Sequence, residues 1–161
     1  MEIYLVRHAE YVDLGSETVE QDSQNRLSEE GISKLQRQAQ TLAEWKLPVK
    51  RILTSPFVRA RETAEILAHH LQVPVVEHTA LTRTQFNTAG LRQIVQEYAR
   101  TEHLMLVGHE SDLSTAAAEV MGGGQIELAR GGIIRMTVDP QTLHGRLIWL
   151  LAPEVMGAEV I

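Results

Sequence analysis

Short apolar runs alternate with stretches of helical periodicity, and this order constrains the fold of the chain more than any other feature. Strands are expected at residues 2–6, 51–55, 73–77 and 103–109. The first and last of these runs lack the polar alternation of a half-exposed strand, which is typical of strands covered on both faces. Strands that alternate with helices predict an α/β fold, a three-layer sandwich whose mainly parallel central sheet carries helices on both faces.

The intervening helices are predicted from apolar residues that recur every three or four positions. The three stripes are Ile32, Leu35, Ala39 and Leu42; Phe57, Ala60, Ala64, Leu67 and Leu71; and Leu91, Ile94, Val95 and Tyr98. Ser28 is expected to cap the first helix, and Ser55-Pro56 to begin the second. Ser111 or Asp112 should cap a last helix, which the glycines at 122–124 end. Residues 13–25 are interpreted as a surface loop, and two final strands are expected at 132–138 and 146–151.

Composition narrows the classes of protein that this chain can belong to. Its 161 residues fit one domain spanning 1–161. The net charge of −6 argues against a nucleic-acid partner, and the absence of cysteine excludes disulfides and a thiol nucleophile. The N-terminus lacks the features of a signal peptide, and no apolar run is long enough to cross a bilayer. We therefore expect a cytoplasmic monomer with no membrane association, no metal and no other cofactor.

Polar residues follow three of the apolar runs, and they predict where a site would form. Arg7 and His8 end the first run, Ser55 ends the second with Arg59 one helical turn on, and His109 ends the fourth. Parallel α/β sheets bind ligands outside the carboxyl ends of their strands. If these three strands are neighbours, two arginines and two histidines converge there with a serine hydroxyl. Such a group predicts a pocket for a phosphate dianion.

The residue types suit phosphoryl transfer, although each has an ordinary alternative role. An arginine fork can hold two phosphoryl oxygens, and a histidine can act as a nucleophile. Transfer of a phosphoryl group depends mainly on positioning and charge stabilisation, which such side chains provide without a metal. Taken singly, Arg7 could be a surface arginine at a strand end, and an isolated histidine more often packs than reacts. The ordered set, each member at a strand end, favours a site.

Three segments, "LVRHAE", "LTSPFVRARETAE" and "LMLVGHES", resemble the motifs of the histidine phosphatase superfamily, which has the phosphoglycerate-mutase-like fold. The resemblance extends over nearly the whole chain. It implies that His8 becomes phosphorylated and that Arg7, Arg59 and His109 hold the phosphoryl group. Water would then hydrolyse the phosphohistidine intermediate.

The length of the chain narrows the resemblance further. Between Leu81 and His103 the sequence has room for one helix, whereas mutases and many small-molecule phosphatases of the superfamily insert a lid near this point. Without a lid domain the site would be open enough to accept a phosphorylated side chain of another protein. The chain is thus most similar to the small SixA-type phosphohistidine phosphatases, and a phosphorylated protein is its expected partner.

One departure from the family pattern bears on the substrate. Relatives often carry an acidic residue where this chain has Ala80, and Glu77 or Glu10 could serve instead. A general acid matters for an alkoxide leaving group, whereas an imidazole can take its proton from water. The departure favours phosphohistidine over a phosphoester. A phosphatase for small phosphoesters, such as a sugar phosphate or a nucleotide-derived ester, and a non-catalytic phosphate-binding module are the alternatives.

Three charged residues near the predicted site have expected positions. Arg61 should face solvent and pair with Glu65 one helical turn on. Glu110, next to His109, should cap a helix or face solvent, because an inward carboxylate would repel phosphate. Arg130 is a further candidate for the rim of the pocket.

Overall fold

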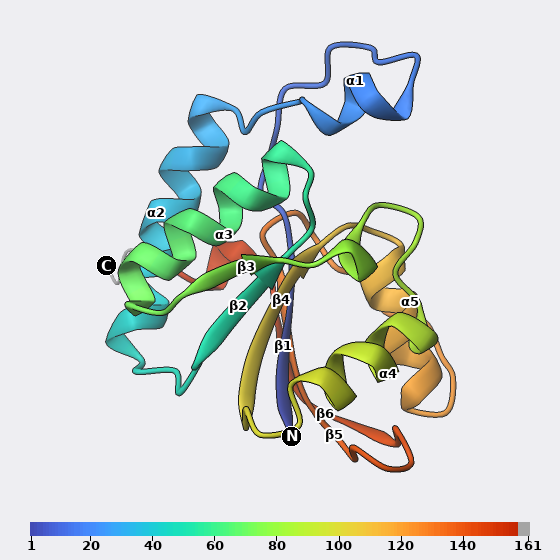
Figure 1. The fold of residues 1–161 in the computed structure, drawn as a ribbon. Coiled ribbons are helices and arrows are strands. Elements are labelled where there is room, and N and C mark those ends of the chain that lie inside the picture. Colours follow the sequence, from blue (N-terminus) through green and yellow to red (C-terminus); the bar gives the residue numbers. More distant parts are fainter. Residues whose placement is uncertain (158–161) are drawn as a thin grey trace.

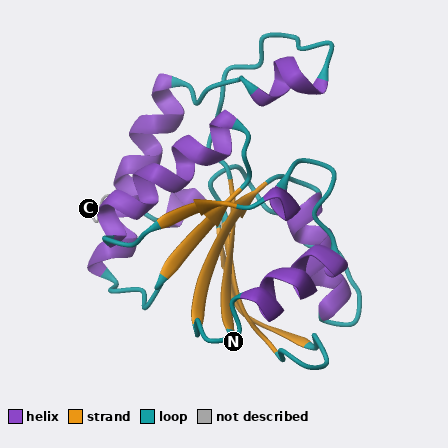
Figure 2. Cartoon of the chain, in the orientation of Figure 1, coloured by secondary structure: helices purple, strands orange, loops and turns teal. Residues whose placement is uncertain are grey.

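A computed structural model describes residues 1–157, which form a six-stranded sheet between two layers of helices (Figure 1, Figure 2). The strands are β1 (Glu2–Arg7), β2 (Arg51–Thr54), β3 (Val75–Glu77), β4 (His103–Gly108), β5 (Ile133–Val138) and β6 (Gly145–Leu151). The helices are α1 (Val19–Ser23), α2 (Glu29–Glu44), α3 (Val58–Leu71), α4 (Thr88–Glu97) and α5 (Asp112–Val120), with the 3₁₀ helices η1 (Thr79–Leu81) and η2 (Pro153–Val155). The predicted range 1–161 includes residues 158–161, which lie outside the described residues.

The strand order β3-β2-β4-β1-β5-β6 places the three strands with polar ends side by side. β2, β3, β4 and β1 pair in parallel, whereas β5 and β6 run antiparallel to their neighbours. The expected α/β sandwich with a mainly parallel sheet is therefore confirmed. Arg7 pairs with Gly108, and Thr54 pairs with Val107, so the carboxyl ends of β1, β2 and β4 lie at one edge. Between β3 and β4 the chain forms only η1 and α4, and no lid domain is inserted there.

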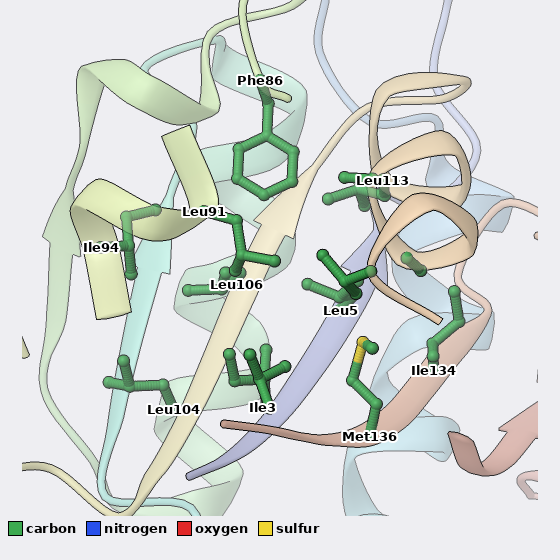
Figure 3. Close-up of a cluster of buried hydrophobic side chains, with 14 of the residues drawn as sticks. Ile3, Leu5, Phe86, Leu91, Ile94, Leu104, Leu106, Leu113, Ile134 and Met136 are labelled. Carbon is green, nitrogen blue, oxygen red and sulfur yellow. The ribbon is translucent and has the colours of Figure 1, made fainter. Parts of the chain in front are cut away.

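Both faces of the sheet are covered, which explains why its central strands are uniformly apolar. Ile3 and Leu5 of β1 pack under α4 and α5 in the cluster that Figure 3 shows. Tyr4 and Val6, one residue away, belong to the opposite cluster under α2 and α3. All four side chains are fully buried. Successive side chains of a strand point to opposite faces, so burial on both sides needs an unbroken apolar run.

The interpretation of residues 13–25 as a loop is wrong in part, because α1 forms there. Thr18 caps this helix by accepting a hydrogen bond from the backbone N–H of Gln21 at 3.1 Å. No residue of α1 is buried, so the helix has no apolar stripe that a periodicity analysis could detect. We call residues 12–24, which include α1, the arm. Figure 1 shows the arm above the carboxyl ends of the strands.

The predicted start of the second helix is also wrong, by two residues. α3 begins at Val58, and Phe57 before it is extended, with φ −64° and ψ 138°. The hydroxyl of Ser55 accepts a hydrogen bond from the backbone N–H of Phe57 at 3.2 Å. The same hydroxyl contacts His109 at 2.8 Å. The Ser55-Pro56 pair therefore lies in the turn before α3 and does not form the start of the helix.

Most other predicted boundaries agree with the structure. Ser28 caps α2 by accepting from the N–H of Gly31 at 3.0 Å. α5 ends at Val120, and the glycines at 122–124 all have positive φ, as expected for residues that end a helix. The third strand is shorter than predicted and begins at Val75. Within residues 1–157, no helix is long and apolar enough to cross a membrane.

Candidate active site

The carboxyl ends of β1 and β4 bring the two predicted histidines together. His8 directly follows β1, and His109 directly follows β4. Their ring centroids are 5.3 Å apart, and both side chains are almost fully buried. Because the two strands are hydrogen-bonded neighbours, this distance is set by the sheet itself. The histidines therefore lie on one side of the molecule, as the sequence predicts.

One ring nitrogen of His8 is held by the backbone, and the other faces Arg59. Nδ1 lies 2.9 Å from the carbonyl oxygen of Ala9, which can only accept a hydrogen bond. Nδ1 therefore carries the proton of the neutral ring, and Nε2 keeps its lone pair. Nε of Arg59 donates to Nε2 over 3.4 Å. The ring of Tyr11 packs edge-on against His8, with centroids 5.2 Å apart.

The environment keeps both histidines neutral. The pKa of His8 is lowered to about 3: burial lowers it most, the Ala9 contact opposes this, and the positive charges of Arg59, Arg7 and Arg130 add to the lowering. The pKa of His109 is lowered to about 2, mainly by burial and to a lesser extent by His8 and the nearby arginines. An imidazole that stays uncharged at neutral pH has a free lone pair. Such a nitrogen is able to act as a nucleophile.

Ser55 lies next to His109. Its Oγ is 2.8 Å from Nε2 of His109 and also accepts the N–H of Phe57, and the residue is fully buried. When Oγ donates its proton to Nε2, the proton of the His109 ring is left on Nδ1. Nδ1 is buried and has no hydrogen-bond partner in the described part of the chain. Ser55 thus sets which nitrogen of His109 acts as a donor, and its predicted contact with substrate stays a prediction.

Arg7 presents a second buried donor of the same kind. Its NH1 donates to the carbonyl oxygen of Leu128 at 3.0 Å, which fixes the far end of the side chain. Its Nε is buried and, among residues 1–157, has no partner. Burial lowers the pKa of Arg7, and the charge of Glu110 opposes this shift. A buried donor without an acceptor destabilises a protein, so Arg7 Nε and His109 Nδ1 suit an anion with several oxygens.

Arg59 completes the group, and it contacts a residue that the sequence analysis missed. Its side chain is only 2% exposed. Its Nε faces His8, whereas its two terminal nitrogens contact Asp22 of the arm. Asp22 also pairs with Arg83, which precedes α4, at 2.7 Å. Neither Asp22 nor Arg83 belongs to a periodic apolar pattern or directly follows a strand, so neither periodicity nor strand ends mark them in the sequence.

The flanking charged residues lie mostly as expected. Arg130 reaches the rim, where its guanidinium lies 5.1 Å from the centroid of the Tyr11 ring. Oε1 of Glu110 accepts the N–H of Ser114 at 2.9 Å, so this carboxylate caps α5. The expected pair of Arg61 with Glu65 is wrong. Arg61 instead contacts Glu77 at 3.3 Å, because the end of β3 lies beside the first turns of α3.

The two acids considered as proton donors are both engaged at the surface. Glu77 binds Arg61, and Glu10 binds Lys34 at 3.2 Å. Neither forms a hydrogen bond or ion pair with Arg7, His8, Arg59 or His109 among the contacts of residues 1–157. In the same range, no group of three or more His, Asp or Glu side chains is arranged to hold a metal ion.

A comparison with protein families decides which family the chain represents. The model of the histidine phosphatase superfamily (branch 1) matches residues 3–120. The chain belongs to this superfamily. The matched segment contains the motifs around Arg7, His8, Arg59 and His109, so the resemblance seen in the sequence is confirmed. As a member of the histidine phosphatase superfamily, the protein is a hydrolase with phosphatase activity.

Individual relatives agree with this assignment and with the fold. An uncharacterised protein of Picosynechococcus sp. is 32% identical over 142 residues, which cover 83% of each chain. The solved structure of the protein histidine phosphatase SixA with tungstate superposes with a TM-score of 0.83 and 22% identity, over 95% of this chain and 97% of that one. The structure of a mycobacterial glucosyl-3-phosphoglycerate phosphatase with inorganic phosphate superposes with a TM-score of 0.75 and 15% identity, over 95% of this chain and 98% of that one. At these identities the two structures show the fold alone.

Proposed function

We propose that this phosphatase removes phosphate from phosphohistidine on a protein, through a phosphohistidine intermediate on its own His8, and that it needs no metal. One observation carries the proposal. Nε2 of His8 is unprotonated and buried, and the nearby hydrogen-bond donors are Nε of Arg59, Nε of Arg7 and Nδ1 of His109. This arrangement combines a nucleophile with groups that can stabilise three equatorial phosphoryl oxygens.

The reaction runs in two displacements at phosphorus. Nε2 of His8 attacks, the bond from phosphorus to the substrate nitrogen breaks, and the electron pair of that bond returns to the departing imidazole. Water then attacks the phosphorus on His8, which releases inorganic phosphate and restores the neutral ring. Arg7, Arg59 and His109 donate to the oxygens in both steps, where charge stabilisation lowers the barrier. The Nδ1 contact with Ala9 keeps His8 oriented throughout.

The leaving group is inferred from the placement of the acids. An alkoxide needs a proton from a placed acid, but Glu77 and Glu10 are held in surface ion pairs. The pKa of Asp22 is lowered, because Arg59 and Arg83 outweigh the effect of its burial. A departing imidazole has an ordinary pKa near ~6.5 and can take its proton from water. This chemistry favours phosphohistidine over a phosphoester.

The chain around the pocket supports a protein substrate. Only η1 and α4 lie between β3 and β4, so no inserted domain covers the pocket on that side. SixA, whose structure superposes well on this chain, is described as a protein histidine phosphatase. A phosphorylated side chain that projects from another protein could reach His8 from this side.

The test compares substrates side by side. We expect kcat/KM for a phosphohistidine-bearing protein domain to exceed that for sugar phosphates and nucleotide-derived esters, with no loss on addition of EDTA. Faster turnover of an alkyl phosphate would favour the small-molecule alternative. Phosphate binding without turnover of any substrate would favour the binding module, and strong inhibition by EDTA would contradict the metal-free mechanism.

A further inference from the structure

The carboxylate of Asp22 links two arginines at the mouth of the pocket. Oδ1 lies 3.1 Å from NH1 of Arg59, and Oδ2 accepts from NH2 of Arg59 at 3.2 Å. Oδ2 also accepts from NH1 of Arg83 at 2.7 Å. The backbone oxygen of Asp22 accepts from NH1 of Arg59 at 2.8 Å. These contacts connect the arm with α3 and with the loop that precedes α4.

The contacts determine which edge of Arg59 faces the nucleophile. A guanidinium is a planar fork, and both of its terminal nitrogens are turned toward Asp22. Nε on the opposite edge is therefore turned toward Nε2 of His8. The guanidinium carbon lies 4.4 Å from the centroid of Tyr11 and 5.2 Å from that of Phe57, so aromatic rings limit its tilt. Asp22 and the rings together fix the orientation.

Burial makes this contact stronger than an ordinary surface ion pair. The side chains of Arg59 and Asp22 are 2% and 13% exposed. Charge-assisted hydrogen bonds that are shielded from water are short, directional and strong. Burial raises the pKa of Asp22, but hydrogen bonds and charges from Arg59 and Arg83 outweigh this and hold the pKa below its usual value. Asp22 therefore acts as a carboxylate and not as a proton donor.

The arm depends on these contacts, since apolar packing does not hold its helix. No residue of α1 is buried, and Val12, Leu14 and Val19 of the arm are exposed. Asp22 joins α1 to the body of the protein by its carboxylate and by its backbone oxygen. The backbone contact with Arg59 does not depend on the side chain. A substitution that removes only the carboxylate thus leaves one link of the arm in place.

We propose that Asp22 is a positioning residue for phosphoryl transfer: its carboxylate holds the terminal nitrogens of Arg59 and thereby directs the Nε edge of Arg59 to the phosphoryl group on His8. The proposal rests on the proposed function, because it concerns the same pocket and the same intermediate. It has a consequence that a purely structural role lacks. Removing the carboxylate should impair the reaction and, by removing a negative charge, should strengthen the binding of a free anion.

The test uses Asp22→Asn with Glu20→Gln as its matched control. Both substitutions remove one negative charge from α1, but Glu20 is exposed and makes no side-chain contact with Arg59 among the described residues. For D22N we expect kcat on a phosphohistidine peptide to fall roughly ten- to a hundredfold, as for a misaligned catalytic group. The inhibition constant of inorganic phosphate should fall by about threefold, since a nearby repelling charge is gone. E20Q should leave both values unchanged.

Two further measurements keep the outcomes distinct. Asp22→Glu retains the charge and should recover part of kcat, and thermal unfolding should show D22N to be folded at the assay temperature. A D22N enzyme with the kcat of E20Q would overturn the proposal, as would weaker phosphate binding in a folded D22N enzyme. If the wild type hydrolyses phosphoesters but not the phosphohistidine peptide, the proposed function fails while the role of Asp22 can still be tested. The kcat and the inhibition constant of phosphate are then compared for D22N and E20Q with the phosphoester as substrate.

Discussion

The floor of the pocket and the arm above it are built in different ways. Arg7, His8 and His109 extend from strands whose neighbouring residues are fully buried, so the sheet fixes their positions. No residue of α1 in the arm is buried, and the arm is attached by the carboxylate of Asp22, which binds Arg59 and Arg83. The core thus positions Arg7, His8 and His109, whereas polar contacts hold Asp22, which orients Arg59. Changes to the floor should affect reaction and stability strongly, and changes to most of the arm should affect neither.

The largest expected effect concerns Arg59, where floor and arm meet. Arg59→Met should lower kcat/KM by roughly 10³-fold, because it removes donors to the phosphoryl oxygens in the transition state. Steady-state kinetics on phosphohistidine measure the loss. Arg61→Met is the matched control on the same helix, since Arg61 contacts only the exposed Glu77 among its described ion pairs. Equal losses in both variants would show that the position in the pocket is irrelevant.

A second prediction is the sensitivity of the folded floor to acid. The native pKa values of His8 and His109 are about 3 and about 2, whereas both titrate near ~6.5 in the unfolded chain. Below pH ~6.5 the unfolded chain binds protons that the native protein cannot, so stability is lost as pH falls from there toward the native values. The free energy of unfolding should drop by up to about 1.4 kcal/mol per pH unit for each histidine.

Urea unfolding between pH 7 and pH 5 in phosphate-free buffer measures this slope, in a range where most carboxylates stay ionised. His8→Asn should reduce the slope by about half, because one of the two buried neutral rings is gone. A stability that does not change over this range would contradict the burial of both histidines in neutral form.

A smaller effect is expected at Ser55, which contacts His109 of the floor. Ser55→Ala should lower kcat by about tenfold, because Nε2 of His109 loses the partner that sets its tautomer, while the donor to the phosphoryl group is still present. Ser28→Ala is a suitable control, because it removes the cap of α2, and the Ser28 hydroxyl bonds only Gly31 and Glu10 among the described residues. It should reduce stability by about 1 kcal/mol and leave kcat unchanged. Unchanged kcat in S55A would exclude this role of Ser55.

The smallest effect is expected on the exposed side of the arm. Leu14 is 77% exposed, whereas Leu5 of β1 is fully buried. Leu14→Ala should change the free energy of unfolding by less than about 0.5 kcal/mol, and Leu5→Ala should reduce it by about 2–5 kcal/mol. Chemical unfolding of the two variants makes the comparison direct. A marked loss of stability in L14A would mean that the arm is packed more tightly than its contacts indicate.

The same contrast explains what could be predicted from the sequence. β1 and β4 are unbroken apolar runs because both their faces are covered, and this pattern also revealed Arg7, His8 and His109 at their ends. α1 has no buried face, so apolar periodicity did not indicate a helix in residues 13–25, and the capping residue Thr18 was the signal that could have shown it. Asp22 reaches Arg59 across a sequence separation of 37 residues, through a fold that periodicity cannot place.

Two local predictions were wrong because the side chain contacts a residue that is distant in the sequence. Ser55 was expected to begin a helix, but α3 begins at Val58, and the Ser55 hydroxyl contacts the Phe57 N–H and His109. Arg61 was paired with Glu65 by helical spacing, yet the neighbouring β3 brings Glu77 closer. Helical spacing and capping rules describe isolated elements. They do not include the competition from a residue that tertiary structure places nearby.

The most direct test of the central claim is to trap the intermediate. The enzyme is mixed with a ³²P-labelled phosphohistidine substrate, quenched with base within the first turnover, and mapped by mass spectrometry. The account predicts an acid-labile, base-stable phosphoryl group on His8 that the His8→Ala variant lacks. Turnover with label on another residue, or turnover of the substrate by His8→Ala at the wild-type rate, would contradict it.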